Sequence, residues 1–168
     1  MTISMHSASV PVFSRLLGNM RVWLDKAESH ALTRKFDAGN YLGLRLAPDM
    51  LPLVRQVQIA SDSAKGGVAR LAGLEVPKWD DDEATMGGLR ERIGKTIEYV
   101  QSIPATAIDG SEVREIVLPM RVGEPLRFDG ESYLKHFVLP NFYFHSTNVY
   151  ALLRHAGVEL GKRDFLGG

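Results

Sequence analysis

The sequence has 168 residues, of which 45% are hydrophobic and 24% are charged, and these values are typical of a globular domain with one core. Its 20 basic and 20 acidic residues cancel, so the basic surface of a nucleic-acid-binding protein is not expected. The lack of cysteine excludes disulfides, thiolate metal ligands and a cysteine nucleophile.

The chain also lacks the signals of export and of membrane insertion. No run of about 18 apolar residues is present, so no membrane span is expected. Residues 1–6 contain no basic region followed by an apolar run, so no signal peptide is expected. We therefore expect a single cytoplasmic domain over residues 1–168.

The first predicted helix covers about residues 4–32. Its apolar residues alternate between spacings of three and four, as in the seam of a helical bundle. Pro11 lies inside this segment and is expected either to kink the helix or to mark its true start. The seam consists of Val10, Phe13, Leu17, Met20, Leu24, Ala27 and Ala31.

Two further helices are predicted in the middle of the chain. One runs over about residues 50–72, with Pro52 in its first turn and Gly73 at its end. The next begins after Thr85, which is a suitable N-cap. The acidic run at 80–83 is interpreted as a solvated lead-in that favours the helix dipole.

The helical pattern breaks at residues 104–130, which predict a short irregular hairpin. The last helix is predicted from Glu131 to Gly157, with a kink at Pro140. Four long amphipathic helices with one longer crossover predict an all-α four-helix bundle.

One histidine interrupts the apolar face of the last predicted helix. His145 lies in the middle of this face, Asn141 lies one turn before it, and Asn148 follows nearly one turn after it. Polar groups that face a bundle interior need partners, because each unsatisfied buried group costs about 1–3 kcal/mol.

The helix at 50–72 offers such partners along its apolar stripe. We predict a polar site at the edge of the core, suited to a metal or a small polar ligand. Its candidate residues are Gln58, Ser61, Asp62, Asn141 and His145. The alternative interpretation is a core histidine that is only hydrogen-bonded to a neighbour.

Three consecutive aromatic residues precede His145. Phe142, Tyr143 and Phe144 cannot all face inward on one helix. One or two of them would form an exposed apolar patch, and such a patch is a candidate interface for a homodimer.

Five stretches of the sequence carry a resemblance to a known group of proteins. On these stretches the chain resembles the DinB/YfiT-like superfamily of four-helix bundles, which are proposed metalloenzymes, and within it an uncharacterised bacterial family of unknown function. The resemblance covers essentially the whole chain. The stretches are Gln58-x-x-x-Asp62-x-Ala64-Lys65, Arg70-Leu71-Ala72-Gly73, Pro140 to His145, Leu153-Arg154-His155-x-Gly157 and Gly161 to Gly167.

The superfamily implies a metal site with one histidine from the second helix and two from the last, spaced i, i+4. By the resemblance, the last ligand falls on His145, the preceding one on Asn141, and the remaining one near Gln58 or Ser61. The implied metal set is therefore His145, Asn141 and Gln58, with zinc or nickel as the expected ion. Two of these positions carry amides, which are poor ligands for such metals, and Asp62 would supply a replacement oxygen.

Two functions follow from these observations. The first is an enzyme with a degenerate site for a divalent metal or small ligand, of the thiol-dependent transferase or hydrolase type found among characterised relatives. In that enzyme His145 would anchor the metal, and Gln58 and Asn141 would orient the substrate. The alternative is a non-catalytic, dimeric bundle that binds a ligand or partner without metal.

Overall fold

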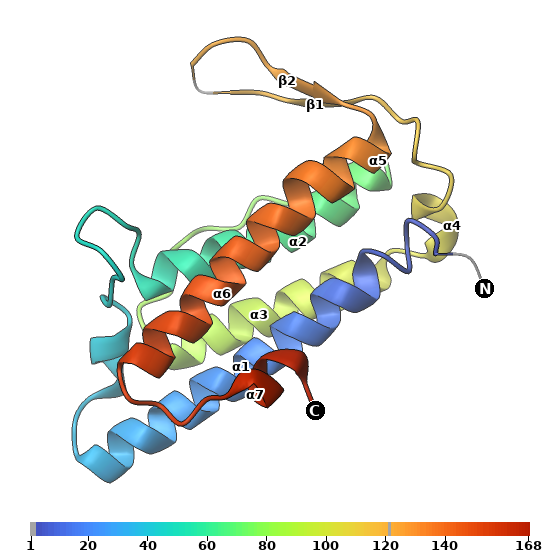
Figure 1. The fold of residues 1–168 in the computed structure, drawn as a ribbon. Coiled ribbons are helices and arrows are strands. Elements are labelled where there is room, and N and C mark those ends of the chain that lie inside the picture. The colour runs from blue at the N-terminus through green and yellow to red at the C-terminus, as the bar shows by residue number, and fades with distance from the viewer. Residues whose placement is uncertain (1–2, 121) are drawn as a thin grey trace.

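The computed structural model describes residues 3–120 and 122–168, and it confirms the predicted all-α bundle (Figure 1). The last of the four long helices continues from α5 and η2 as one rod. The long helices are α1 (Val10–Arg34), α2 (Leu53–Leu71), α3 (Met86–Ser102) and α6 (Leu139–His155), and the shorter ones are η1 (Ala38–Tyr41), α4 (Ala105–Ile108), α5 (Gly130–Tyr133), η2 (Leu134–Val138) and α7 (Lys162–Leu166).

The helix ends follow from local sequence. Pro11 lies in the first turn of α1, so it marks the start of this helix, where its missing N–H is not needed. The side chain of Thr85 accepts a hydrogen bond from the Gly88 N–H at 3.0 Å, which confirms the predicted N-cap of α3. Gly73 follows α2 with a φ of 72°, a conformation that favours glycine.

The disturbance expected at Pro140 takes the form of a widened turn. Because proline has no N–H, it cannot complete the α-helical hydrogen bonding of this segment. The chain forms a π-helical turn, η2, immediately before α6, and the Leu139 N–H donates to the Leu134 carbonyl five residues back. The rod therefore continues without a break from α5 into α6 (Figure 1).

The core lies where α2 packs between α3 and α6, with α1 on the opposite side against α3 and α6. Gly67 lets α2 approach η2 closely, because a Cβ at this position would lie 2.6 Å from Cγ1 of Val138. The largest fully buried side chains are Trp23, Tyr133, Phe13, Phe142, Leu17, Met20, Leu24, Leu53, Leu71, Leu89, Ile93 and Ile108.

The predicted hairpin is present between α4 and α5. Strands β1 (Ile116–Leu118) and β2 (Leu126–Phe128) pair antiparallel and extend beyond the end of the bundle (Figure 1). The C-terminal helix α7 packs on α1, where the Trp23 indole N–H donates to the Asp164 carbonyl at 3.0 Å.

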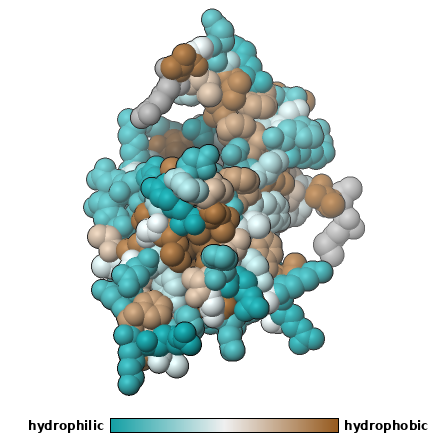
Figure 2. Space-filling model, turned by 60° about the vertical axis from the view of Figure 1, so that its left-hand side comes forward, coloured by the Kyte–Doolittle hydropathy of each residue, from teal (hydrophilic) through white to brown (hydrophobic). Residues whose placement is uncertain are grey.

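The outer surface mixes both kinds of side chain. On the face in Figure 2, apolar areas are interleaved with hydrophilic side chains. Across the described residues, no helix combines the length and the apolar character that crossing a membrane would require.

Candidate functional site

His145 binds a glutamine of α2. Its half-buried imidazole places Nδ1 2.7 Å from Oε1 of Gln56. The Gln56 amide nitrogen donates to the Leu51 carbonyl at 3.0 Å, so the amide oxygen must face the imidazole. Nδ1 of His145 therefore carries the proton and donates it. Asn148 donates to the same oxygen at 3.4 Å, which completes a small polar cluster.

The expected approach of Gln58 to His145 is not formed. Oε1 of Gln58 accepts a hydrogen bond from Arg55 at 2.7 Å, and Nε2 donates to Glu83 at 2.7 Å. Positions 56 and 58 lie about 200° apart around an α-helix, so they face opposite neighbours. Gln56 takes the place that the sequence interpretation gave to Gln58.

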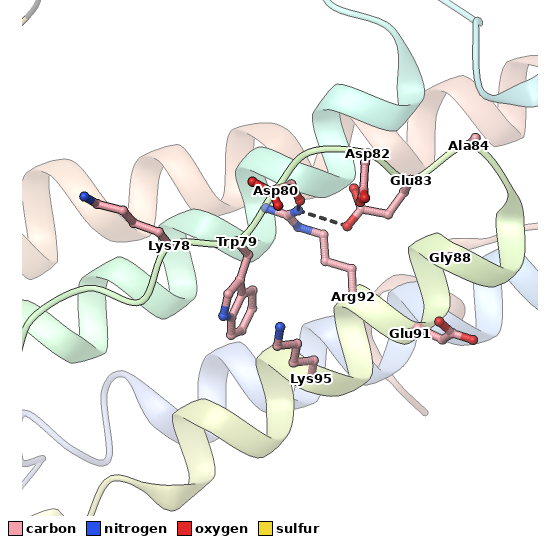
Figure 3. A pocket seen from close by; sticks show the side chains of 10 residues that line it. All are labelled: Lys78, Trp79, Asp80, Asp82, Glu83, Ala84, Gly88, Glu91, Arg92 and Lys95. Carbon is pink, nitrogen blue, oxygen red and sulfur yellow. Dashed lines mark hydrogen bonds and ion pairs between the residues drawn. The ribbon is translucent and has the colours of Figure 1, made fainter.

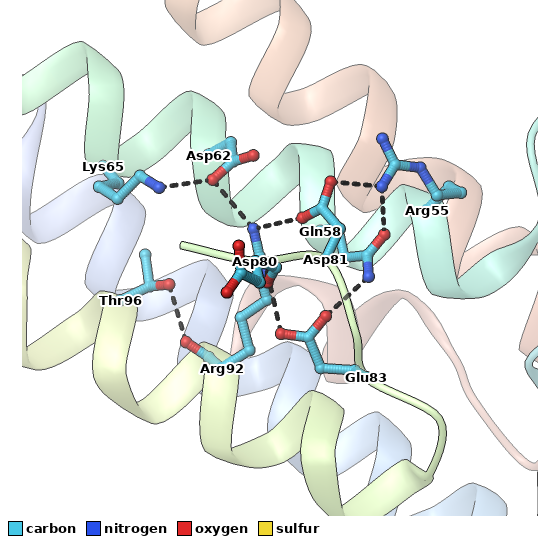
Figure 4. Close-up of polar contacts among 9 residues, drawn as sticks. All are labelled: Arg55, Gln58, Asp62, Lys65, Asp80, Asp81, Glu83, Arg92 and Thr96. Atoms are coloured by element: carbon cyan, nitrogen blue, oxygen red, sulfur yellow. Dashed lines mark hydrogen bonds and ion pairs between the residues drawn. The ribbon is translucent and has the colours of Figure 1, made fainter. Parts of the chain in front are cut away.

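Gln58 belongs instead to an ion-pair network around Arg92 of α3 (Figure 4). The Arg92 side chain is only 2% exposed and pairs with three carboxylates. They are Asp62 at 3.0 Å, Asp81 at 2.9 Å and Glu83 at 2.9 Å. The interpretation of the acidic run as a solvated lead-in therefore holds only in part: Asp80, Asp81 and Asp82 are exposed, but Asp81 and Glu83 also compensate a buried cation.

The charges in this network stabilise one another. Burial alone would lower the pKa of Arg92, but the hydrogen bond to Glu83 and the charges of its carboxylates raise it. Burial alone would likewise raise the pKa of Asp81, but Arg55 and Arg92 lower it. Arg92 and Asp81 therefore stay ionised, and the network holds α2, the acidic loop and α3 together.

A cavity of about 630 Å³ adjoins this network between the loop and α3 (Figure 3). Two of the residues that line it, Lys95 and Trp79, are in contact, with the Lys95 ammonium 4.4 Å from the centre of the Trp79 ring. The ammonium of Lys65, which does not line the cavity, lies 4.2 Å from the centre of the same ring. The terminal nitrogens of Arg92 already contact Asp62, Asp81, Glu83 and the Asp80 carbonyl. The Arg92 guanidinium is thus engaged with the protein itself.

A smaller groove of about 230 Å³ runs along α2 and the continuous α5–η2–α6 helix. It brings together Asp62 and Asn141, two of the predicted site residues, from different helices. Its polar lining is otherwise supplied by groups that the sequence interpretation did not select. The complete lining is Asp62, Ser63, Arg70, Tyr133, Phe137, Val138 and Asn141.

Two other predicted residues lie elsewhere. His145 is one turn beyond Asn141 and does not line the groove. Ser61 is fully buried, and its hydroxyl has no hydrogen-bond partner within the described segments. The other four predicted residues are therefore divided among the groove, the His145 cluster and the Arg92 network, and Ser61 belongs to none of them.

The groove carries a cation without an anionic partner. Arg70 donates from Nη1 to the Tyr133 hydroxyl at 3.1 Å, and no carboxylate of residues 3–120 or 122–168 lies within ion-pair distance of it. A single arginine in a helix gives no periodic signal, so the sequence interpretation missed it. The only local cue was its place in the Arg70 to Gly73 stretch.

The residues at the three implied ligand positions do not fit a zinc or nickel triad. His145 is held by Gln56, the Asn141 amide nitrogen donates to the Phe137 carbonyl at 2.8 Å, and Gln58 faces the acidic loop. No group of three or more histidine and acidic side chains with metal-binding geometry occurs in the described part of the chain. One imidazole and two engaged amides are a poor donor set for these metals.

Comparison with known proteins identifies the family. The family model for a domain of unknown function, DUF1993, matches residues 5–166. The chain belongs to this family. A crystal structure of a DinB family member from Shewanella denitrificans is 40% identical and covers 97% of this chain and 92% of its own, with a TM-score of 0.87. A search of curated proteins finds no match.

These findings confirm the resemblance and the bundle fold. Over nearly its entire length, this chain matches the DUF1993 family and is similar to a DinB family member. The reaction, the ligand and the metal stay predictions.

Proposed function

We propose that this protein binds a small polar molecule in the groove between α2 and the α5–η2–α6 helix, without a metal triad. The observation that carries the proposal is the cation of Arg70, which faces the groove without an anionic partner among the described residues. A partly buried cation of this kind is well suited to a ligand that supplies the missing charge.

The construction of the groove supports this proposal. Ligand sites in helical bundles are built from side chains on facing helices, and they combine apolar walls with a few convergent polar groups. Here Phe137 and Val138 supply the wall, while Asp62 and Asn141 supply polar groups from opposite sides. All of them lie on helical segments, Phe137 and Val138 on the π-helical turn η2, so the site needs little ordering on binding.

The residues at the implied metal-ligand positions decide between the two functions considered for the sequence, a metal-dependent enzyme and a metal-free binding protein. A metal-dependent transferase uses its ion as a Lewis acid, and that ion needs ligands that hold it tightly. The engaged amides of Asn141 and Gln58 favour the alternative, a bundle that binds its ligand with side chains alone.

A thermal-shift screen tests the proposal. Polar metabolites are added to wild type, to Asn141→Leu, which removes a groove amide, and to the control Thr147→Ala, an exposed position of the same helix. Ligand at about 100 times its Kd stabilises the fold by about 2.7 kcal/mol, which raises the Tm by several degrees. Hits should act on wild type and the control but not on Asn141→Leu. Equal action on all three proteins, or no hit, would contradict the proposal.

We further propose that the protein forms a homodimer. Its localisation in the cytoplasm is a prediction from the sequence. Tyr143 and Phe144 are 42% and 57% exposed on α6, where they offer an apolar surface to a second copy of the chain. Sedimentation should show a dimer at micromolar concentration that dissociates in Phe144→Ser. A monomer in wild type would contradict this arrangement.

A further inference from the structure

One end of the α2–η2 groove presents hydrogen-bond donors. Arg70 donates one N–H to the Tyr133 hydroxyl oxygen at 3.1 Å, so its other N–H groups and the phenolic hydrogen are available. Burial raises the pKa of Tyr133 against the opposing effect of Arg70, which keeps the phenol protonated. A guanidinium beside a phenol is matched by an acceptor such as a carboxylate.

The other end presents acceptors. The Asn141 amide nitrogen donates to the Phe137 carbonyl at 2.8 Å, which leaves the amide oxygen and one N–H of Asn141 free. Both ion pairs of Asp62 use Oδ1, which contacts Lys65 at 2.8 Å and Arg92 at 3.0 Å. Oδ2 of Asp62 has no hydrogen bond to any described residue, and the side chain is 42% exposed. An amide oxygen and a carboxylate oxygen are matched by a donor such as an ammonium group.

The two ends lie about one helical turn apart. The Arg70 side chain folds back along α2, because a Cβ on Gly66 would lie 2.6 Å from Nη1 of Arg70. The guanidinium is therefore level with Gly66, and Gly66 is four residues, or about 6 Å along the axis, from Asp62. The cavity of about 230 Å³ is smaller than the usual range for drug-sized ligands and suits a short molecule.

We infer that the ligand of this groove is a short amino carboxylate. Its carboxylate binds Arg70 and Tyr133, and its ammonium group faces Asp62 and Asn141. This inference rests on the proposed function and names the ligand class for the same groove. Inorganic phosphate is the weaker match, because its second negative charge would meet the Asp62 carboxylate without compensation.

Calorimetry on the full chain tests the ligand class. The probes are β-alanine, 4-aminobutyrate and 6-aminohexanoate, which differ in length. Butyrate lacks the ammonium group, butylamine lacks the carboxylate, and inorganic phosphate is the competing anion. At least one amino carboxylate should bind ten or more times more tightly than butyrate, butylamine or phosphate.

Variants locate the binding. Arg70→Gln should weaken the amino carboxylate at least tenfold, and Arg70→Lys should weaken it less, because the charge remains but the planar fork is lost. Gly66→Ala should also weaken it, because the added methyl takes the place of Nη1. The exposed control Arg154→Gln should bind as wild type does. Urea unfolding of each variant verifies that it is folded at the assay temperature.

Each outcome decides a different point. Equal binding of butyrate, or tighter binding of phosphate, would overturn the amino carboxylate. If another class of molecule binds and Asn141→Leu abolishes it, the ligand class is wrong while the proposed function stands. If no probe and no library compound binds the groove, both are wrong.

Discussion

Nδ1 of His145 donates to Oε1 of Gln56 across 2.7 Å, and this contact joins the middle of α6 to the first turn of α2. The Leu51 carbonyl fixes the orientation of the Gln56 amide, and the amide in turn fixes the tautomer of the imidazole. The single histidine of the implied triad is thereby part of a hydrogen-bonded cluster at the bundle edge.

His145 should make the stability of the protein depend on pH. Burial lowers its pKa below the ordinary 6.5, so the folded chain releases the proton more readily than the unfolded chain. The unfolded chain binds more protons as the pH falls through 6.5, and the free energy of unfolding must decrease over that range. Urea unfolding between pH 7.5 and 5 measures this decrease.

Two variants separate this effect from other titrations. His145→Gln should reduce the loss of stability between pH 7 and 5.5, while the exposed His155→Gln should retain it. A direct NMR titration should give a His145 pKa below 6.5. A value above 6.5, or an unchanged pH profile in His145→Gln, would show that burial does not control this imidazole.

The donor set predicts weak binding of transition metals. After incubation with zinc, nickel and manganese and then dialysis, elemental analysis of untagged wild type should find less than about 0.1 equivalent of any of them, and His145→Ala should match it. Near-stoichiometric metal in wild type that is lost in His145→Ala would restore the metalloenzyme hypothesis.

The sequence predicts the bundle well, because hydrophobic periodicity and helix caps are local signals. Pro11, Thr85 and Gly73 lie at helix ends as their chemistry requires. The site is predicted only in part. The apolar stripe of α2 is bordered by polar residues on both sides, so periodicity alone could not distinguish Gln56 from Gln58 as the partner of His145.

The Arg92 network could not be predicted for a different reason. Its partners come from the loop and from α2, up to 30 residues away, and no helical pattern relates them. The buried arginine is visible only once α2 and α3 pack together. Asp62 and Asn141, in contrast, were selected because they border apolar stripes, and the structure does bring them to one groove.

Removal of the buried Arg92 should strongly destabilise the fold. Arg92→Met leaves three carboxylates without their shared cation, and breaking a buried pair of this kind costs about 3–5 kcal/mol. The matched variant is Arg90→Met. The Arg90 side chain is 27% exposed and pairs with Asp25 and Glu28, which are 61% and 37% exposed. The loss of this surface cation should cost less than about 1 kcal/mol. Urea unfolding compares the two. Equal losses would show that the network contributes nothing beyond a surface pair.

Two adjacent glycines of α2 should respond differently to alanine. At Gly67 the new methyl would meet Cγ1 of Val138 at 2.6 Å inside the packed interface, so overpacking should offset the gain of up to about 1 kcal/mol in helix propensity. At Gly66 the methyl would come closer than 3 Å only to the end of the long Arg70 side chain, which can shift, so Gly66→Ala should be the more stable of the two. The difference in Tm checks this, and a Gly67→Ala protein as stable as Gly66→Ala would contradict the close helix contact.

NMR mapping of the backbone amides in chelator-treated protein tests whether the groove between α2 and the α5–η2–α6 helix binds its ligand without metal. We expect a bound amino carboxylate, or another polar hit, to shift the amide signals of residues 62–70 and 133–141 without added metal, and we expect Asn141→Leu to abolish the shifts. Shifts confined to the larger cavity beside Trp79 and Lys95, or binding that appears only after metal is added, would contradict it.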